Sequence, residues 1–156
     1  MSDTTVFGKV DSVDFAIYLN KKANEKDLPI NVTKIQKWLY ICYGLFLAAY
    51  DEQLLDERPK AWNYGPAFPK VHKKQKNNQD SLDGLEKELD LEKFSAYDDV
   101  IDAVLRTFGR WTASELVAWT HERGTAWDKV FRSSEMYTPI SNEDIKSDFV
   151  KLLQNG

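Results

Sequence analysis

The sequence has a single cysteine and only two histidines among its 156 residues. One cysteine excludes an internal disulfide and any zinc site built from several cysteines. The histidines, His72 and His121, are far apart, and neither belongs to an HExxH pattern or to another spacing typical of metal ligands. We therefore expect no metal and no cofactor. Cys42 lies in an apolar stretch, which favours a buried thiol over a reactive one.

Glycine, proline and excess positive charge are also scarce. Seven glycines and five prolines are too few for the many turns of a β-sandwich or barrel. The net charge of −4 does not favour nucleic-acid binding. The main apolar stretch is shorter than the roughly 20 residues that span a bilayer, and residues 1–12 lack the apolar core of a signal peptide. We expect a cytoplasmic protein that does not enter a membrane.

The motifs of common catalytic sites are missing as well. The sequence contains no G-x-S-x-G, no Walker A and no G-x-G-x-x-G motif, and Cys42 has no histidine at a catalytic spacing. Pairs of carboxylates for general acid and base catalysis can always be found among 25 acidic residues, so they do not indicate an active site. The sequence therefore does not support an enzyme.

What the chain does contain is a dense apolar stretch at residues 33–50. Apolar residues recur there at steps of three and four, and apolar or aromatic residues fill most of the opposite face. This pattern predicts a central helix that protein surrounds on nearly all sides, with Thr33 as its N-cap. By its length the chain should form one domain, residues 12–153, after a short, poorly structured lead-in of residues 1–11.

Other segments with helical periodicity predict further helices. Ser12, Thr112 and Thr125 are the expected N-caps of three of them, and Thr112 and Glu115 fit a capping box. On the last helix, the expected inward residues are Ile145, Phe149, Leu152 and Leu153. The predicted helices cover residues 13–26, 69–78, 95–110, 112–121, 126–131 and 141–153.

Two short extended pieces, near residues 54–55 and 60–63, are expected to pair as a hairpin, with Gly65-Pro66 as a turn after them. The predicted fold is mainly α. It is a single compact domain of six or seven helices around the buried central helix, with a small extended or hairpin insertion near residues 53–64.

Residues 80–102 carry nine acidic residues and two lysines. A run of this kind is usually a solvated helical face, and a binding surface is the alternative. His72 lies in the lysine-rich residues 70–76, which indicates a solvated surface or, alternatively, a site for phosphate or an acidic partner. For His121, at the end of a predicted helix, a capping or hydrogen-bonding role is favoured over catalysis.

Trp62, Tyr64 and Phe68 surround the Gly65-Pro66 turn. Core packing is the simpler interpretation of these rings. The alternative is a partner-facing anchor, because Trp and Tyr supply much of the energy at protein interfaces.

Several motifs follow one another in a recognisable order. KIQKWLY (34–40) and YGLFLA (43–48) are similar to LQKLLYFAYGWHLA, and AWNYGP (61–66) is similar to AWxYGPV. SELVAWTH (114–121), GTAW (124–127) and ISNEDI (140–145) are similar to LSxLTH, GSPW and ISDEDI. Together they resemble the Panacea domain, a family first catalogued as a phage-associated domain of unknown function that includes SocA-like antitoxins. Phe46, Ala67 and Ala126 depart from the family pattern.

By this resemblance, a further set of residues are family-motif positions with structural roles. They are Gln36, Lys37, Trp38, Tyr40, Tyr43, Gly44, Gly65, Pro66, Thr120, His121 and Trp127.

The resemblance implies the antitoxin of a toxin–antitoxin system, carried by bacteria or prophages. It implies that the protein neutralises a growth- or translation-inhibiting toxin, such as a toxic small alarmone synthetase, by direct protein binding. The alternative is a proteolytic adaptor that delivers a toxin to ClpXP. The residues expected to contact the partner are Trp62, Tyr64, Phe68, Lys70, Lys73 and Lys74.

Two further classes remain open. One is a small enzyme with a site around His121, Glu122 and Trp127. The other is a transcriptional regulator, which the sequence disfavours because no helix-turn-helix with a basic recognition helix is evident.

Overall fold

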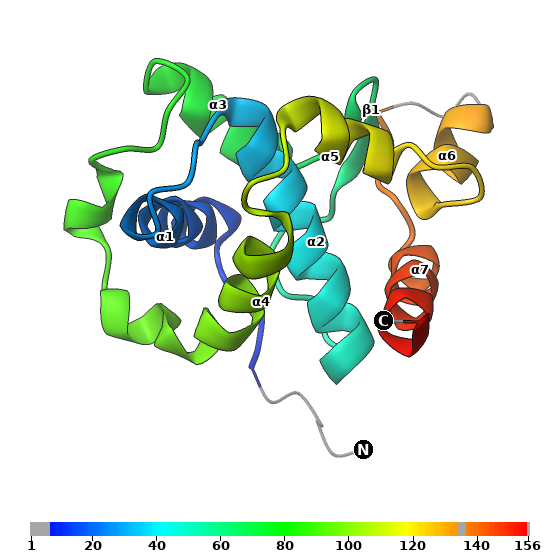
Figure 1. Cartoon of the computed structure of the whole chain (residues 1–156), viewed down its shortest axis with the longest axis horizontal. Coiled ribbons are helices and arrows are strands. Elements are labelled where there is room, and N and C mark those ends of the chain that lie inside the picture. The colour runs from blue at the N-terminus through cyan, green and yellow to red at the C-terminus, as the bar shows by residue number, and fades with distance from the viewer. Residues whose placement is uncertain (1–6, 134–136, 156) are drawn as a thin grey trace.

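The computed structural model describes residues 7–133 and 137–155 of the chain (Figure 1). Its α-helices are α1 (Ser12–Glu25), α2 (Val32–Tyr50), α3 (Pro69–Asn77), α4 (Asp98–Phe108), α5 (Ala113–Thr120), α6 (Ala126–Arg132) and α7 (Asn142–Asn155). Two 3-10 helices, η1 (Leu85–Glu88) and η2 (Leu91–Tyr97), and two strands, β1 (Lys60–Trp62) and β2 (Gly65–Ala67), complete these elements. The prediction of a mainly α fold with six or seven helices is confirmed.

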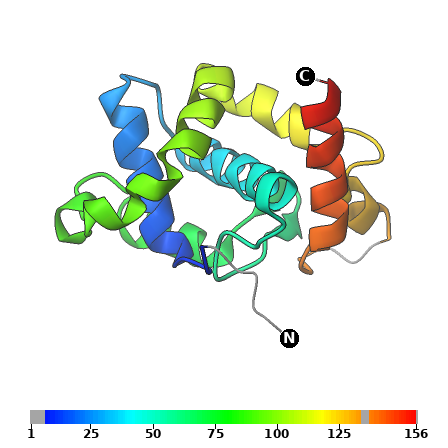
Figure 2. The ribbon, with the colours of Figure 1, turned by 90° about the horizontal axis from the view of Figure 1, so that it is seen from below.

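Helix α2 is the centre of the molecule. It contacts α1, α3, α4, α5, α7 and β2, and Figures 1 and 2 show it enclosed between α1 on one side and α7 on the other. Trp38 is fully buried in it, and its indole N–H donates to the Phe108 carbonyl at 3.2 Å. Cys42 is fully buried too, and burial raises the pKa of its thiol. The prediction of a central helix surrounded by protein is therefore confirmed.

Two of the predicted N-caps are wrong by one or two residues. Asn31, not Thr33, caps α2, because its side chain accepts from the Lys34 N–H at 2.9 Å. Asp11, not Ser12, caps α1 in the same way. In both cases the cap is an Asx residue just before the expected position, and its short side chain reaches the free N–H groups of the first turn.

The other two predicted caps are confirmed. Thr112 and Glu115 form the expected capping box, with hydrogen bonds of 2.9 and 3.1 Å between side chain and backbone. Thr125 caps α6, where its hydroxyl accepts from the Asp128 N–H.

The predicted hairpin pairing is wrong. Strand β1 pairs with β2 instead, with Ala61 opposite Pro66 and Trp62 opposite Gly65. Gly65 takes a φ of +112°, which favours glycine and lets the chain reverse after Asn63 and Tyr64. Residues 54–55 pair elsewhere: the Leu54 carbonyl accepts from the N–H of residue 10, in a parallel bridge.

Of the expected lead-in, residues 7–11 lie against the domain, whereas residues 1–6 are outside the described ranges. Phe7 packs edge-on against Phe46 at a centroid distance of 4.9 Å. Val10 exchanges backbone hydrogen bonds with residues 54 and 56. Phe7 and Val10, three residues apart, thus pack this segment against the core.

The acidic residues 80–102 form η1, η2 and the start of α4. The helix predicted over 95–110 begins at Asp98, because residues 91–97 turn as a 3-10 helix whose Phe94 and Tyr97 are buried. Phe94 stacks on Tyr18 of α1 at 5.5 Å. Tertiary packing of these rings, rather than helix propensity, determines the local conformation.

Helix α7 packs against α2 through a close approach at Gly44. A Cβ atom at this position would lie 2.1 Å from two ring carbons of Phe149. Ile145 and Phe149 are buried as predicted, but Leu152 and Leu153 are 36% and 53% exposed. Their assignment to the inward face is wrong, because the burial of this apolar face does not extend beyond Phe149 to the last turn of the helix.

No helix in the described ranges has both the length and the apolar character needed to cross a bilayer.

Candidate functional site

The hairpin of β1 and β2 is held in place by side chains from α2 and α6, the anchoring residues Gln36, Lys37 and Trp127. The Lys37 ammonium donates to the Pro66 carbonyl at 2.9 Å, and the Trp127 indole donates to the Trp62 carbonyl at 2.8 Å. The Gln36 amide accepts from the Phe68 N–H at 2.7 Å and donates to its carbonyl at 3.3 Å. An isolated two-stranded hairpin is marginally stable in water, so these bonds fix its position.

Residues 137–140 add a third extended segment beside β1. The Ala61 N–H donates to the Thr138 carbonyl at 3.0 Å, and the Tyr137 N–H donates back to the Ala61 carbonyl at 2.8 Å. The Ile140 N–H donates to the Pro59 carbonyl at 2.9 Å. The hairpin is therefore bonded on its other edge as well.

Gly65 is needed where the hairpin crosses α2 and α5. A Cβ atom at Gly65 would lie 2.8 Å from the Thr120 hydroxyl and 3.0 Å from the Lys37 ammonium. The backbone of β2 therefore approaches both side chains more closely than any other residue would allow.

Lys37 is a buried cation at this crossing. It is 1% exposed, and no acidic side chain in the described ranges lies within ion-pair distance of it. Burial lowers the pKa of Lys37 to about 7. Its hydrogen bond to Pro66 thus comes with a large desolvation cost.

His121 serves as a packing surface for the anchoring tryptophan. Its ring stacks on Trp127 with a centroid distance of 3.9 Å and an angle of 4°. Its buried Nε2 has no hydrogen-bond partner among the residues described. Burial, together with the charge of Lys37, lowers the pKa of His121, so the neutral ring is favoured. Within residues 7–133 and 137–155, no three His, Cys, Asp or Glu side chains are grouped to hold a metal ion.

The remaining family-motif positions lie in the same core. Trp38 and Gly44 make the contacts with α4 and α7 described above, and the Tyr43 hydroxyl donates to the Asn142 side chain at 2.6 Å. These three residues therefore join α2 to α4 and α7 in the core and do not form an exposed surface.

A pocket of about 300 Å³ lies between the hairpin, the start of α2 and α3. Trp62 and His72 meet edge to face across it at 5.0 Å. Lys37, Lys76 and Asp80 also line it, and Lys76 pairs with Asp80 at 3.1 Å. The charged groups of this pocket therefore include a paired carboxylate and two cations.

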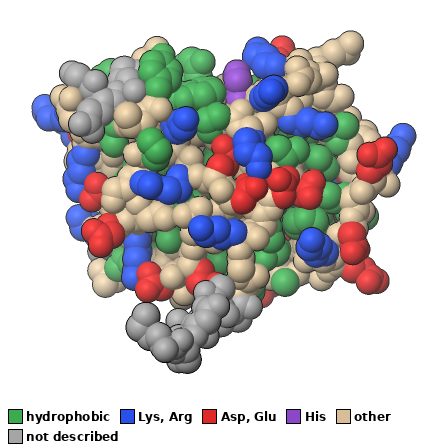
Figure 3. Space-filling model, turned by 180° about the vertical axis from the view of Figure 1, so that it is seen from behind, with side chains coloured by type: hydrophobic (Ala, Val, Ile, Leu, Met, Phe, Trp, Pro, Cys, Tyr) green, Lys and Arg blue, Asp and Glu red, His purple; other side chains and the backbone are tan. Residues whose placement is uncertain are grey.

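The end of the hairpin and the adjoining Tyr137 form a largely exposed surface, rich in aromatic side chains, that we call the hairpin face: Trp62, Asn63, Tyr64 and Tyr137. Tyr64 and Tyr137 are 54% and 57% exposed. The ring of Trp62 lies 6.4 Å from that of Tyr137, and the Asn63 amide donates to the Tyr137 hydroxyl at 3.4 Å. From behind, hydrophobic side chains gather at the upper edge of the molecule beside a histidine and several lysine or arginine side chains (Figure 3).

The structure separates the residues that were predicted to contact a partner. Trp62 and Tyr64 lie on the hairpin face, but Phe68 is fully buried beneath the hairpin. Lys70 points toward the N-terminal segment, where it pairs with Asp56 at 2.6 Å and with Asp11 at 3.2 Å.

Lys73 and Lys74 are exposed on α3. Lys70 and Lys74 are four residues apart and therefore lie on the same side of α3. The side chains of α3 that line the pocket beside the hairpin are His72 and Lys76. Tyr137 was not among the predicted contact residues. Its place beside Trp62 depends on a pairing between segments about 75 residues apart, which no local pattern reveals.

Comparisons with known proteins agree with the motifs. Residues 35–128 match the family model "Antitoxin SocA-like, Panacea domain". The chain is 33% identical over 132 residues to the Antitoxin SocA of Caulobacter vibrioides (strain NA1000 / CB15N). The aligned region covers 78% of this chain and 70% of that protein. No solved structure matches the chain significantly. The chain belongs to the SocA-like antitoxin family and carries its Panacea domain.

Proposed function

We propose that the protein is an antitoxin that neutralises a growth- or translation-inhibiting protein toxin by binding it directly. The observation that carries the proposal is a hairpin that presents exposed aromatic side chains, in a chain that belongs to an antitoxin family. A toxic small alarmone synthetase is one candidate for the toxin. No catalytic role is proposed for this chain.

The hairpin face is the proposed contact surface. Tyrosine and tryptophan are enriched among residues that dominate binding energy, because they bury a large area and lose little rotamer freedom. Here the backbone beneath them is fixed by hydrogen bonds from Lys37 and Trp127. A surface that is already ordered avoids the entropy cost of ordering on binding, so the face is suited to a tight complex.

Co-expression with the product of the neighbouring gene tests the function. We expect that product alone to arrest growth, this protein to restore growth, and the two proteins to purify as a complex. A harmless neighbour, or rescue without any complex, contradicts neutralisation by binding. If the toxin instead disappears faster when ClpXP is present, the protein acts as the alternative, a proteolytic adaptor.

Replacing Tyr64 with alanine is expected to weaken toxin binding at least tenfold, because a central aromatic anchor is lost. The free energy of unfolding should change little, since Tyr64 is 54% exposed. Calorimetric titration of the purified variants measures the affinity. Tyr50→Ala is the matched control, because Tyr50 is similarly exposed (50%) but lies at the far end of α2. Equal losses for both variants would contradict the assignment of the hairpin face.

A further inference from the structure

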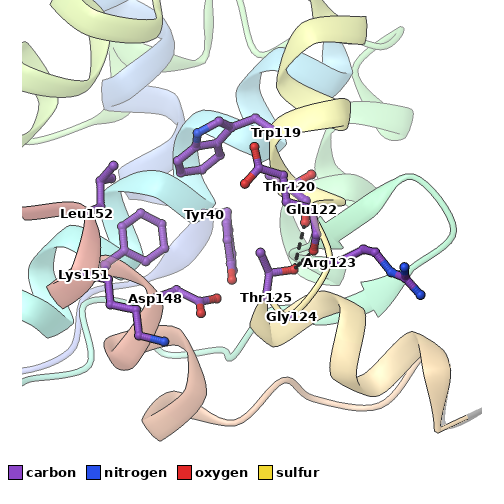
Figure 4. Close-up of a pocket in the computed structure, with 11 residues that line it drawn as sticks. Tyr40, Trp119, Thr120, Glu122, Arg123, Gly124, Thr125, Asp148, Lys151 and Leu152 are labelled. Carbon is purple, nitrogen blue, oxygen red and sulfur yellow. Dashed lines mark hydrogen bonds between the residues drawn. The ribbon is translucent and has the colours of Figure 1, made fainter. Parts of the chain in front are cut away.

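A second pocket, which we call the α7 pocket, lies where α7 meets α2, α5 and the loop before α6 (Figure 4). Its volume is about 310 Å³. Tyr40, Trp119 and Phe149 supply aromatic walls, with Phe149 meeting the other two rings edge to face at 5.7 and 6.0 Å. The space is large enough for one long side chain and too small for a helix.

The Tyr40 hydroxyl is an unused polar group in this pocket. Tyr40 is 3% exposed, yet its hydroxyl has no hydrogen-bond partner among the residues that the structure describes. Figure 4 shows the hydroxyl directed toward the end of the pocket that holds the Asp148 carboxylate. Tyr40 lines the pocket, and its unpaired hydroxyl is therefore placed to bond an incoming group.

Asp148 is the second polar group of the pocket. One of its oxygens accepts from the Ala126 N–H at 2.7 Å, but no lysine or arginine in the described ranges lies within ion-pair distance of it. Burial raises the pKa of Asp148, because no direct counter-charge compensates its desolvation. The charges of Lys129 on α6 and Lys151 on α7 lower this pKa without an ion pair to Asp148, and Lys129 is instead paired with Asp144 at 3.3 Å.

The rim carries charges of both signs. Glu122, Arg123 and Lys151 are exposed there, and Figure 4 shows the Arg123 side chain directed away from the pocket. The interior therefore offers a carboxylate, a hydroxyl and aromatic faces. A positive charge is attracted by aromatic faces and by a carboxylate at the same time.

We propose that the α7 pocket binds a basic side chain, an arginine or a lysine, of the partner protein. This proposal rests on the proposed function, because it takes the toxin as the source of the side chain. The aliphatic stem packs against Trp119 and Phe149, and the cationic end reaches Asp148 and the Tyr40 hydroxyl. The chain's net charge of −4 favours a partner with basic surface residues.

The pocket chemistry is tested without the toxin. N-acetyl-L-arginine amide serves as the probe and N-acetyl-L-glutamine amide as its uncharged counterpart, and the indole N–H signal of Trp119 reports binding by NMR. We expect the arginine probe to shift this signal saturably and the glutamine probe to leave it unchanged. Equal effects of the two probes, or no shift with either, would overturn the proposal.

Two variants remove the polar groups while keeping the fold. Asp148→Asn retains an acceptor for the Ala126 N–H, and Tyr40→Phe removes a hydroxyl that bonds nothing in the described structure. We expect Asp148→Asn to weaken the arginine probe at least tenfold and Tyr40→Phe to weaken it several-fold, with unfolding transitions like that of the wild type. Unchanged probe affinity in both variants would contradict the assigned roles.

The source of the side chain is tested with the toxin. Asp148→Asn should lower the affinity for the neighbouring gene's product at least tenfold. The matched control Asp144→Asn, one turn away on α7 and already paired with Lys129, should leave it unchanged. If Asp148→Asn weakens binding of the arginine probe but not of the toxin, the pocket binds a free small cation, and the basic side chain does not come from the partner protein. If wild type does not bind the product, the proposed function fails, while the probe titration still reports on the pocket.

Discussion

Replacing Gly44 with alanine is expected to lower the free energy of unfolding by about 3 kcal/mol, the upper part of the usual range for overpacking a core. The added methyl group would lie 2.1 Å from two ring carbons of Phe149. Relief requires α7 to move away from α2, and this is the most extensive contact between elements of the fold. Without the clash, alanine would stabilise the helix by about 1 kcal/mol relative to glycine. The measured loss of stability is therefore the cost of the clash minus this gain.

Urea unfolding of Gly44→Ala, Phe149→Ala and the double variant measures this. Phe149→Ala alone should cost about 3–5 kcal/mol through its cavity. The double variant should lose clearly less than the sum, because the new methyl group occupies part of the space that the ring vacates. Strict additivity, or a Gly44→Ala variant as stable as wild type, would show that the ring of Phe149 does not cover Gly44.

Replacing Lys37 with methionine is expected to make the protein more stable at pH 7 and to flatten its pH dependence. Burial moves the pKa of Lys37 from 10.5 to about 7, which corresponds to about 5 kcal/mol. Between these two pH values, the unfolded chain holds a proton on Lys37 that the folded chain lacks. The free energy of unfolding of the wild type therefore rises with pH through this window, and the full cost remains below pH 7.

Methionine has no charge to bury but leaves the Pro66 carbonyl without its donor, which costs about 1–3 kcal/mol. The net gain at pH 7 is therefore about 2–4 kcal/mol. It should shrink as the pH rises and change sign between about pH 8 and pH 10, where the cost of deprotonating Lys37 falls below the value of its hydrogen bond.

Denaturant unfolding at several values between pH 6 and 10 measures the difference between wild type and Lys37→Met. Lys73→Met is the control, because Lys73 is exposed on α3 and its loss should preserve the wild-type profile. A constant difference between wild type and Lys37→Met across this range would contradict a lowered pKa for Lys37.

Much of the fold could be predicted from the sequence because its signals are local. Helix periodicity, the capping box at Thr112 and the N-cap at Thr125 depend on residues within one or two turns of each other. The signals for the two misplaced caps were also local. In each case the true N-cap is an Asx residue one or two positions earlier, Asp11 or Asn31. The start of α4 and the exposure of Leu153 could not be predicted in this way, because both depend on packing against residues distant in the sequence.

The hairpin and its face were only partly predictable. Trp62 and Tyr64 could be identified as candidate anchors because their rings adjoin a turn signal. The pairing of β1 with β2, however, depends on Lys37 and Trp127, which lie on separate helices. The burial of Phe68 depends on its bonds to Gln36, and the place of Tyr137 depends on the pairing of residues 137–138 with Ala61, so local patterns could not reveal them.

The anchoring bonds of the hairpin all involve its backbone: the carbonyls of Trp62, Pro66, Ala61 and Phe68, and the N–H groups of Ala61 and Phe68. Such bonds do not depend on which side chains the two tip positions, Asn63 and Tyr64, carry. Under the proposed function, substitutions at the tip would therefore change toxin recognition at little cost to the free energy of unfolding. If the hairpin face binds the toxin as proposed, partner recognition and stability would be able to evolve separately, because they depend on different groups of the same hairpin.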